Sequence, residues 1–532
     1  MLNFFWEPGQ VTLTKAWRNI PKTAKVAFFS AFCTGVLVYL FALTNQFFGA
    51  GDALNNVITS NNQVWLGRWS TEWLCSLTPD HSMPLVNGMM MILAASLLSA
   101  IVVTYLEIRT AFFAVMSGMV LVCYPTVGNM FKYNFVADGY MIAALLAVLS
   151  LYLLGRYRFG WVLSVPMLAL AMGTYQSNLS LVVALIFTRA VQLILRPTSD
   201  NRMLLKLALR YILATVAALA VYYLLIDVFS RMYGLSLTTY QNADNIGQFS
   251  LVTLVQNFIG CYRDFKNEIT FLSFRSGFYV NGYPNYLFVC LTLGMVGLTY
   301  IFNQNKTILK SIMLFVLFLL SPLLLCSIRL ANPATVYSLM TYSVVCLYLL
   351  GITVLEQLPA LLARLGEVVQ GKTERILEGG KCMRILICIA SWLMILCLII
   401  CLYAWSVGIN LDYMNAYADY ENMYAQCSLY VQMAEKTPGY ESNMPIYVLG
   451  SAAESQVMSR GSTLLFMPKY YHSFMRSVLG VRMPFNTANE IDAEAYAFAE
   501  TETFEKMPVY PDTGCSLVIN GKLYFKLSEV KR

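Results

Sequence analysis

Residues Val26 to Phe48 read VAFFSAFCTGVLVYLFALTNQFF, a run with no charged side chain. About 20 apolar residues in a helix cross the hydrocarbon core of a bilayer. Cations precede the run at Lys15, Arg18, Lys22 and Lys25. The run is too long for the core of a signal peptide and no small-residue cleavage site follows it. We therefore expect an uncleaved first transmembrane helix and a cytoplasmic amino terminus.

The whole 532-residue chain has the same character, with 58% apolar and only 12% charged residues. An average soluble domain is about 25% charged. Ten further apolar segments have roughly spanning length: 85–106, 111–129, 139–155, 160–175, 178–195, 207–228, 285–303, 308–327, 336–357 and 385–407. We therefore predict a polytopic α-helical membrane protein with about eleven transmembrane helices.

Positive charge gives the orientation, because Lys and Arg beside a span resist translocation. Alternate connections carry these residues, and we assign them to the cytoplasm. The other connections are poorer in Lys and Arg for their length and belong outside. The cytoplasmic cations are Arg109, Arg156, Arg158, Arg196 through Arg210, Lys306, Lys310, Arg364, Lys372, Arg375, Lys381 and Arg384, and the long external segments are 49–84, 229–284 and 408–532.

The chain divides into a membrane domain, 1–407, and an external carboxy-terminal domain, 408–532, which we predict to be α/β. About 125 residues are enough for a separate core. Asn520-Gly521 is the preferred dipeptide of a two-residue hairpin turn. The expected elements are a helix at Leu411 to Glu435, a strand at Pro445 to Leu449, and a hairpin of Ser516 to Ile519 with Leu523 to Leu527.

Several functions are excluded or disfavoured by composition and motif. The net charge of +7 is spread between apolar segments, so no nucleic-acid surface is expected. Two histidines and no CxxC pair argue against a His/Cys metal site, so we predict no metal ligands. No phosphate-binding Gly-rich loop, HExxH or GxSxG is present. Most of the 13 cysteines lie in apolar runs, whereas Cys427 and Cys515 could pair if their domain is external.

Acidic residues follow two outward-going spans. Asp52 lies in FFGAGDALNN just after the first span, among small residues that leave room for a substrate. Asp138 lies in MFKYNFVADGYM, beside Lys132, where the fourth span begins. Each could instead cap a helix. Both carboxylates could also converge on one external site.

Cations at the same predicted surface could hold a phosphate. Arg68 lies in QVWLGRWSTEWLCSL, where Trp65, Trp69 and Trp73 recur every four residues and predict a helix lying in the membrane interface. Arg329 stands at the outer edge of a Leu-rich segment, where a guanidinium matches a phosphate bidentately. Pairing with ordinary lipid head groups is the alternative for both.

At these residues the sequence resembles a known family, the bacterial Gtr-type glucosyltransferases of O-antigen and related surface polymers, within the GT-C class of membrane glycosyltransferases. The resemblance covers most of the chain. It rests on an Asp after the first span followed by GRW (67–69), on YNFVADGYMIAALLAVLSLYLL (133–154), on GTYQSNLSL (173–181) and on NAYADYENMYA (415–425).

The resemblance implies an inverting hexosyltransferase of the bacterial inner membrane that works outside. The donor would be a polyprenyl-phosphate sugar, with glucose as the sugar that the resemblance implies, and the acceptor a surface glycan such as O-antigen. Asp52 would be the base and Asp138 would bind sugar, orient the acceptor or help hold a divalent metal. Relatives often carry two adjacent acidic residues, whereas here Ala53 follows Asp52. Substrate-binding residues would be Arg68, Trp69, Lys132, Tyr175, Gln176 and Arg329.

Two alternatives remain open from the sequence. An O-antigen ligase or polymerase would also act on lipid-linked glycans, and segment 229–284 contains Arg231, Arg263 and Arg275 but no His. A lipid or glycan flippase would carry charge within its spans, whereas Asp227 and Arg189 lie near the ends of segments.

Overall fold

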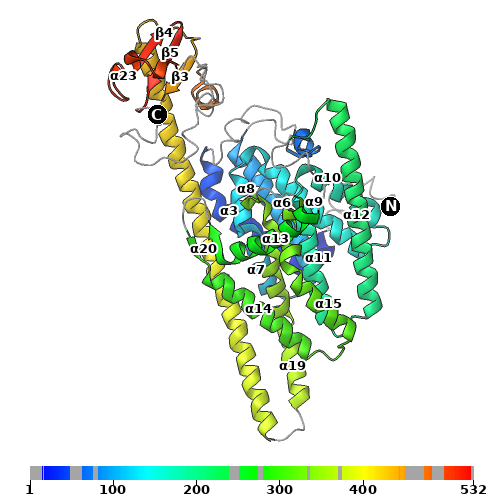
Figure 1. Cartoon of the computed structure of the whole chain (residues 1–532). Coiled ribbons are helices and arrows are strands. Elements are labelled where there is room, and N and C mark those ends of the chain that lie inside the picture. The colour runs from blue at the N-terminus through cyan, green and yellow to red at the C-terminus, as the bar shows by residue number, and fades with distance from the viewer. Residues whose placement is uncertain are drawn as a thin grey trace.

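The structure is a computed structural model of the whole chain. It describes residues 15, 17–47, 63–75, 82–238, 251–273, 279–331, 336–369, 374–442, 444–449, 473–481 and 497–528. Among them helices dominate, and Figure 1 shows most of these helices gathered in one bundle, with the long helix α20 along one side of it.

Seven of the described helices are long and apolar enough to cross a membrane. Two bent pairs of shorter helices raise the number to nine if each pair is one span: α7 (Ala111–Cys123) with α8 (Pro125–Phe131), and the continuous segment Tyr342–Glu356 with Leu358–Leu365. The seven are α3 (Lys22–Thr44), α6 (Pro84–Tyr105), α9 (Asn134–Arg156), α11 (Asn178–Leu195), α12 (Asn201–Tyr233), α14 (Tyr283–Ile301) and the Gly380–Lys436 part of α20 (Glu374–Lys436).

A mostly helical membrane protein is therefore confirmed, whereas the predicted count of eleven spans is not. The fifth and ninth predicted segments contain α10 (Trp161–Thr174) and α15 (Ile308–Leu319), which are apolar but shorter than 18 residues. The tenth contains η3 (Ser338–Met340), η4 (Tyr342–Val344) and α18 (Val345–Glu356). Beyond it, α19 (Leu358–Val369) leads toward α20.

Small residues allow the first helices to pack closely. A Cβ at Gly118 of α7 would lie 2.6 Å from the carbonyl oxygen of Ala27 in α3, and Ala27 and Ala31 are fully buried. Small side chains at such contacts are typical of helices that associate within a bilayer. Pro125 begins α8 after Tyr124, and the two helices meet at 43°. Proline is favoured in the first turn of a helix because it has no N–H to donate.

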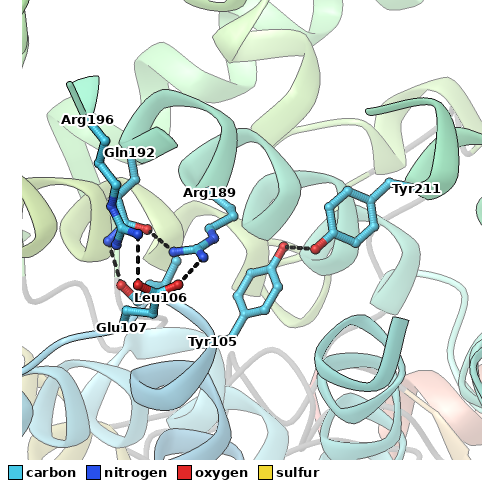
Figure 2. A network of polar contacts seen from close by, with 7 residues as sticks. All are labelled: Tyr105, Leu106, Glu107, Arg189, Gln192, Arg196 and Tyr211. Atoms are coloured by element: carbon cyan, nitrogen blue, oxygen red, sulfur yellow. Dashed lines mark hydrogen bonds and ion pairs between the residues drawn. The ribbon is translucent and has the colours of Figure 1, made fainter. Parts of the chain in front are cut away.

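The chain alternates between two ends of the bundle. We call the end with the amino termini of α6, α9 and α11 the site end, and the end with their carboxyl termini the opposite end. At the opposite end, Glu107 accepts hydrogen bonds from Arg189 and from Arg196 Nη1, the latter at 2.7 Å (Figure 2). Burial alone would raise the pKa of Glu107, but these two guanidinium groups hold that pKa below its usual value. The network joins the loop after α6 to the end of α11.

Helix α13 (Leu251–Thr270) differs from the spanning helices because it is amphipathic and is not among the candidate spans. The strands β1 (Phe271–Ser273) and β2 (Tyr279–Asn281) follow it as a short antiparallel pair. Its neighbours are α14, the short helix α16 (Ser321–Leu325) and α17 (Ile328–Ala331). It therefore lies where the chain returns to the site end after α15.

Helix α20 continues without a break through the predicted boundary at residue 407, and its last turns pack on a small mixed sheet (Figure 1). In this sheet the order is β3 (Ile446–Leu449), β5 (Lys522–Lys526) and β4 (Ser516–Ile519), with β3 parallel and β4 antiparallel to β5. Asn520 and Gly521 have φ of 50° and 72°, so the predicted hairpin turn is confirmed. Cys427 and Cys515 are free thiols buried in the same cluster beside this sheet.

Candidate functional site

The segment before α6 is folded around Arg68 rather than into one interfacial helix. Val64–Leu66 is a 3-10 turn, named η1, and α5 (Thr71–Cys75) is a separate short helix. Gly67 between them has φ of 72°, which interrupts helical structure, and Gln63 forms a β-bridge with Arg68. The predicted continuous tryptophan stripe is therefore wrong.

The three tryptophans accordingly differ in environment. Trp65 and Trp73 are exposed, whereas Trp69 is buried. The Trp69 ring stacks on Phe229 of α12, with centroids 5.4 Å apart. A Cβ at Gly173 would lie 2.4 Å from the Trp69 ring, so a larger residue in α10 would displace it. Trp69 thus anchors the segment that carries Arg68 between α10 and α12.

Arg68 is held by side chains from three parts of the chain. Its Nη1 donates to Gln63 Oε1 at 3.0 Å and to Tyr140 Oη at 3.0 Å. Its Nε donates to Gln176 Oε1 at 3.3 Å. Its Cζ lies 5.0 Å from the centre of the Tyr175 ring, in cation–π geometry. We call Arg68, Gln63, Tyr140, Tyr175 and Gln176 the Arg68 cluster.

The cluster is rigid because its members are themselves fixed. The rings of Tyr140 and Tyr175 stack with centroids 4.4 Å apart. Gln176 Nε2 donates to the carbonyl oxygen of Leu66 at 2.8 Å, and Tyr222 Oη donates to that of Gly67 at 3.2 Å. Half-buried Arg68 therefore presents a fixed positive charge beside two aromatic rings.

Asp138 lies in the same neighbourhood and is fully buried. Its Oδ2 accepts from Asn87 Nδ2 at 3.3 Å and its Oδ1 from the backbone N–H of Gly139 at 2.9 Å. Cys75 packs over Gly139, and burial, together with the charge of Asp138, raises the pKa of the Cys75 thiol. Because α9 begins at Asn134, Asp138 stands inside the helix and the capping alternative for it is wrong.

Lys132 is buried and forms an ion pair with Asp412 of α20. The predicted partner of Lys132 was a lipid phosphate, and in this structure a carboxylate stands in that place. The pair ties the turn before α9 to α20. At the same level, Tyr413 donates a hydrogen bond to the carbonyl oxygen of Gly128 at 2.7 Å.

Arg329 of α17 is paired in a bidentate manner. Its Nε donates to Asp264 Oδ2 at 2.6 Å and its Nη2 to Asp264 Oδ1 at 2.8 Å. A Cβ at Gly260 would lie 3.2 Å from Arg329 Cδ, so the side chain rests directly on α13. The Asp264 carboxylate therefore occupies the position beside the guanidinium that a bidentate phosphate would take.

Glu268 lies one turn beyond Asp264 on the same face of α13. Tyr124 Oη donates to its Oε2 at 3.4 Å. Burial raises the pKa of Glu268 to about 7, and the charge of Asp264 acts in the same direction, against hydrogen bonds from Thr341 and Tyr124. An acid with such a pKa can take up and release a proton near neutral pH.

The two groups of residues lie at one end of the bundle. Ser327, two residues before Arg329, donates to Ser180 in the first turn of α11 at 2.9 Å. Tyr175 and Gln176 immediately precede that helix. The amino-terminal turn of α11 therefore stands between the Arg68 cluster and the Arg329–Asp264 pair.

Asp52, the predicted base, lies outside the described residues, in the segment between α3 and η1. Among the described residues, no group of three or more His, Cys, Asp or Glu could hold a metal ion. Asp264, Glu268 and Asp412 were not among the site residues predicted from the sequence. A signal existed for the first two, because Cys261, Asp264, Phe265 and Glu268 share the i, i+3, i+4, i+7 spacing of one helical face.

Fold and site together define a polytopic helical membrane protein whose charged and aromatic groups gather at one end of the bundle. The chain belongs to the family described as glucosyl transferase GtrII, whose model matches residues 40–348. That range includes the Arg68 cluster, Asp138, Lys132, Asp264, Glu268 and Arg329. No curated protein and no solved structure matches the chain. Membership of this family identifies the chain as a membrane glycosyltransferase.

Proposed function

We propose that the protein moves a hexose, glucose by its family, from a polyprenyl-phosphate sugar to a cell-surface polysaccharide such as O-antigen. The site end would face the outside of the bacterial inner membrane, with the amino terminus in the cytoplasm and residues 408–532 outside. Nucleotide sugars are cytoplasmic, so a transferase with an external site needs a donor whose sugar crosses the bilayer on a lipid. The protein would then be a member of the GT-C class.

The observation that carries the proposal is the Arg68 cluster. A sugar offers hydroxyl groups and an apolar ring face, and a site for it needs a few fixed polar groups among aromatic surfaces. Tyr175 and Gln176 would contact the sugar, and Arg68 would bind the donor phosphate or the hydroxyls beside it. Trp69 would position this segment.

The reaction would be a single displacement with inversion. An acceptor oxygen attacks the anomeric carbon while the bond from that carbon to the phosphate oxygen breaks, and polyprenyl phosphate leaves with the electron pair. Asp52 takes the proton of the acceptor hydroxyl. Arg329 and Arg68 stabilise the charge that develops on the leaving phosphate. Asp138 orients Asn87, its hydrogen-bond partner, toward the sugar. Lys132 holds α20 in place through its ion pair with Asp412.

Reconstitution tests this proposal. Purified protein in liposomes, supplied with polyprenyl-phosphate glucose and a surface polysaccharide, should form a new glycosidic bond. Asp52→Asn should abolish transfer, whereas Asp227→Asn, which removes half of an exposed ion pair with Arg231, should leave it unchanged. Wild-type protein that transfers no sugar from this donor, or that moves the lipid across the membrane without forming a bond, would overturn the proposal. Unchanged turnover of Asp52→Asn would remove Asp52 from the base role alone.

A further inference from the structure

An apolar groove of about 460 Å³ runs between α14 and α15. This volume is within the range of about 300–1,000 Å³ that is usual for ligand pockets. Phe187 of α11 and Leu347 of α18 contribute to its wall, and Val289, Leu293, Leu314 and Phe318 line it from α14 and α15. The exposed side chains of Leu293 and Phe315 border it, so it opens sideways toward the surrounding lipid.

The two ends of the groove differ in chemistry. Toward the opposite end of the bundle, Tyr300 and Ser311 line the groove and share a hydrogen bond of 2.7 Å between their hydroxyl oxygens. Toward the site end, Phe265 of α13 and Ser321 of α16 line it. Phe265 directly follows Asp264, which binds Arg329.

Helix α13 therefore joins an apolar surface to a charged one. One side chain, Phe265, enters the groove, and the residue before it engages a guanidinium. A ligand with an apolar chain and an anionic head fits this order of groups. The chain would lie against Phe265, Phe318 and Leu293, and the head would meet Arg329.

We propose that this groove binds the isoprenoid chain of the donor, with the donor phosphate at Arg329 in the place that Asp264 occupies in the structure. The inference rests on the proposed function for the identity of the lipid. In this arrangement the isoprenoid chain lies between α14 and α15. The lateral opening lets the chain enter from the bilayer without leaving apolar surroundings.

A second hollow on the surface provides a comparison. It is lined by residues of α20 alone, between Arg384 and Leu396, and so has one helix as its wall. Ordinary membrane lipid is expected to occupy such a shallow surface. The groove between α14 and α15, by contrast, has walls from five helices as well as Phe265 of α13.

Two glycines of α14 give a matched pair of variants. An added Cβ at Gly297 or at Gly294 would meet no atom within 4 Å, so each position accepts a larger side chain. Only Gly297 lines the groove. Gly297→Trp should fill the groove, and Gly294→Trp should add the same side chain outside it.

The kinetic test uses full-length protein in liposomes. Gly297→Trp should raise KM for polyprenyl-phosphate glucose about tenfold, the equivalent of about 1.4 kcal/mol of binding. The acceptor KM should not change. A donor with a chain too short to reach Gly297 should be used equally well by Gly297→Trp and by wild type. Equal donor KM for wild type and Gly297→Trp, or an equal increase in both Trp variants, would overturn the assignment.

A binding test separates this inference from the proposed reaction. Polyprenyl phosphate without sugar, carrying a photoreactive group in its chain, should label peptides of α14 and α15 in the wild-type protein. Unlabelled polyprenyl phosphate should compete, and a phospholipid at the same concentration should not. Labelling of α20 to the same extent, or equal competition by phospholipid, would mean that ordinary lipid occupies the groove. Specific labelling without transfer would refute the proposed reaction and leave the groove assignment intact.

Discussion

The guanidinium of Arg329 and the carboxylate of Asp264 form two parallel hydrogen bonds, of 2.6 Å and 2.8 Å, between α17 and α13. Both side chains are largely buried, at 10% and 13% exposure. Removing one partner of such a pair leaves an uncompensated charge, whereas replacing both by apolar groups is often neutral.

Arg329→Ala should therefore destabilise the protein by about 3–5 kcal/mol and weaken donor binding. The double variant Arg329→Met with Asp264→Leu should recover the melting temperature in detergent but not the donor KM. Full recovery of donor KM in the double variant would show that Arg329 acts only through stability.

Arg68→Lys should keep the positive charge and lose the planar arrangement of donors that contacts Gln63, Tyr140 and Gln176. Lysine cannot reproduce these contacts. We expect kcat to fall by about 10²-fold, the scale of one fixed donor removed from a transition state. Arg231→Lys, on the exposed part of α12, is the matched control and should retain wild-type kcat.

Glu268 should make stability fall as pH rises. Its pKa is about 7 in the folded chain and about 4.3 in an unfolded one. The folded state therefore binds the proton more tightly. The resulting contribution to the free energy of unfolding is complete below about pH 4.3 and is lost as pH rises to about 7. The groups that face the carboxyl are Asp264, Tyr124, Thr341, Cys326 and Tyr348.

Glu268→Gln should remove this dependence. The melting temperature of the variant should change less than that of wild type between pH 5 and pH 8, and should exceed it at pH 8. Parallel curves for the two proteins across that interval would show that Glu268 ionises normally.

Glu107 should have the reverse effect, because Arg189 and Arg196 lower its pKa in the folded chain. The stability that Glu107 contributes is complete above the pKa of this carboxyl in the unfolded chain. It is lost as pH falls through the pKa of the same carboxyl in the folded chain. Glu107 is 37% exposed, so solvent screens its ion pairs, and Glu107→Gln should destabilise the protein by about 1 kcal/mol at most at pH 7 and progressively less below about pH 4. Since the network lies at the opposite end, transfer per folded molecule should stay unchanged. A loss of kcat without a loss of melting temperature would contradict this.

The sequence predicted the helices well because apolar length and flanking charge are local properties. Each of the eleven expected segments contains helix, although α10 and α15 are shorter than a span. The hairpin at Asn520-Gly521 was equally local, since two positive φ values select that dipeptide. Membrane character and turn chemistry needed no tertiary information.

The site was harder because it depends on contacts between distant segments. The tryptophan spacing suggested one helix, but Gly67 and the bridge between Gln63 and Arg68 fold the segment back. Asp264 and Glu268 lie in the 229–284 segment, whose polar composition resembles that of an ordinary loop. Their importance depends on Arg329 and Tyr124, which are 65 and 144 residues away in sequence.

Helix α20 separates the small sheet from Lys132 by a fixed length of helix. Asp412 of this helix binds Lys132, and Tyr430 packs against Phe525 of the sheet, with ring centres 5.5 Å apart. Between Asp412 and Tyr430 the helix rises by about 27 Å at 1.5 Å per residue. A single monosaccharide cannot bridge such a span. A ligand that contacts both the sheet and Lys132 would therefore have to be several sugar units long.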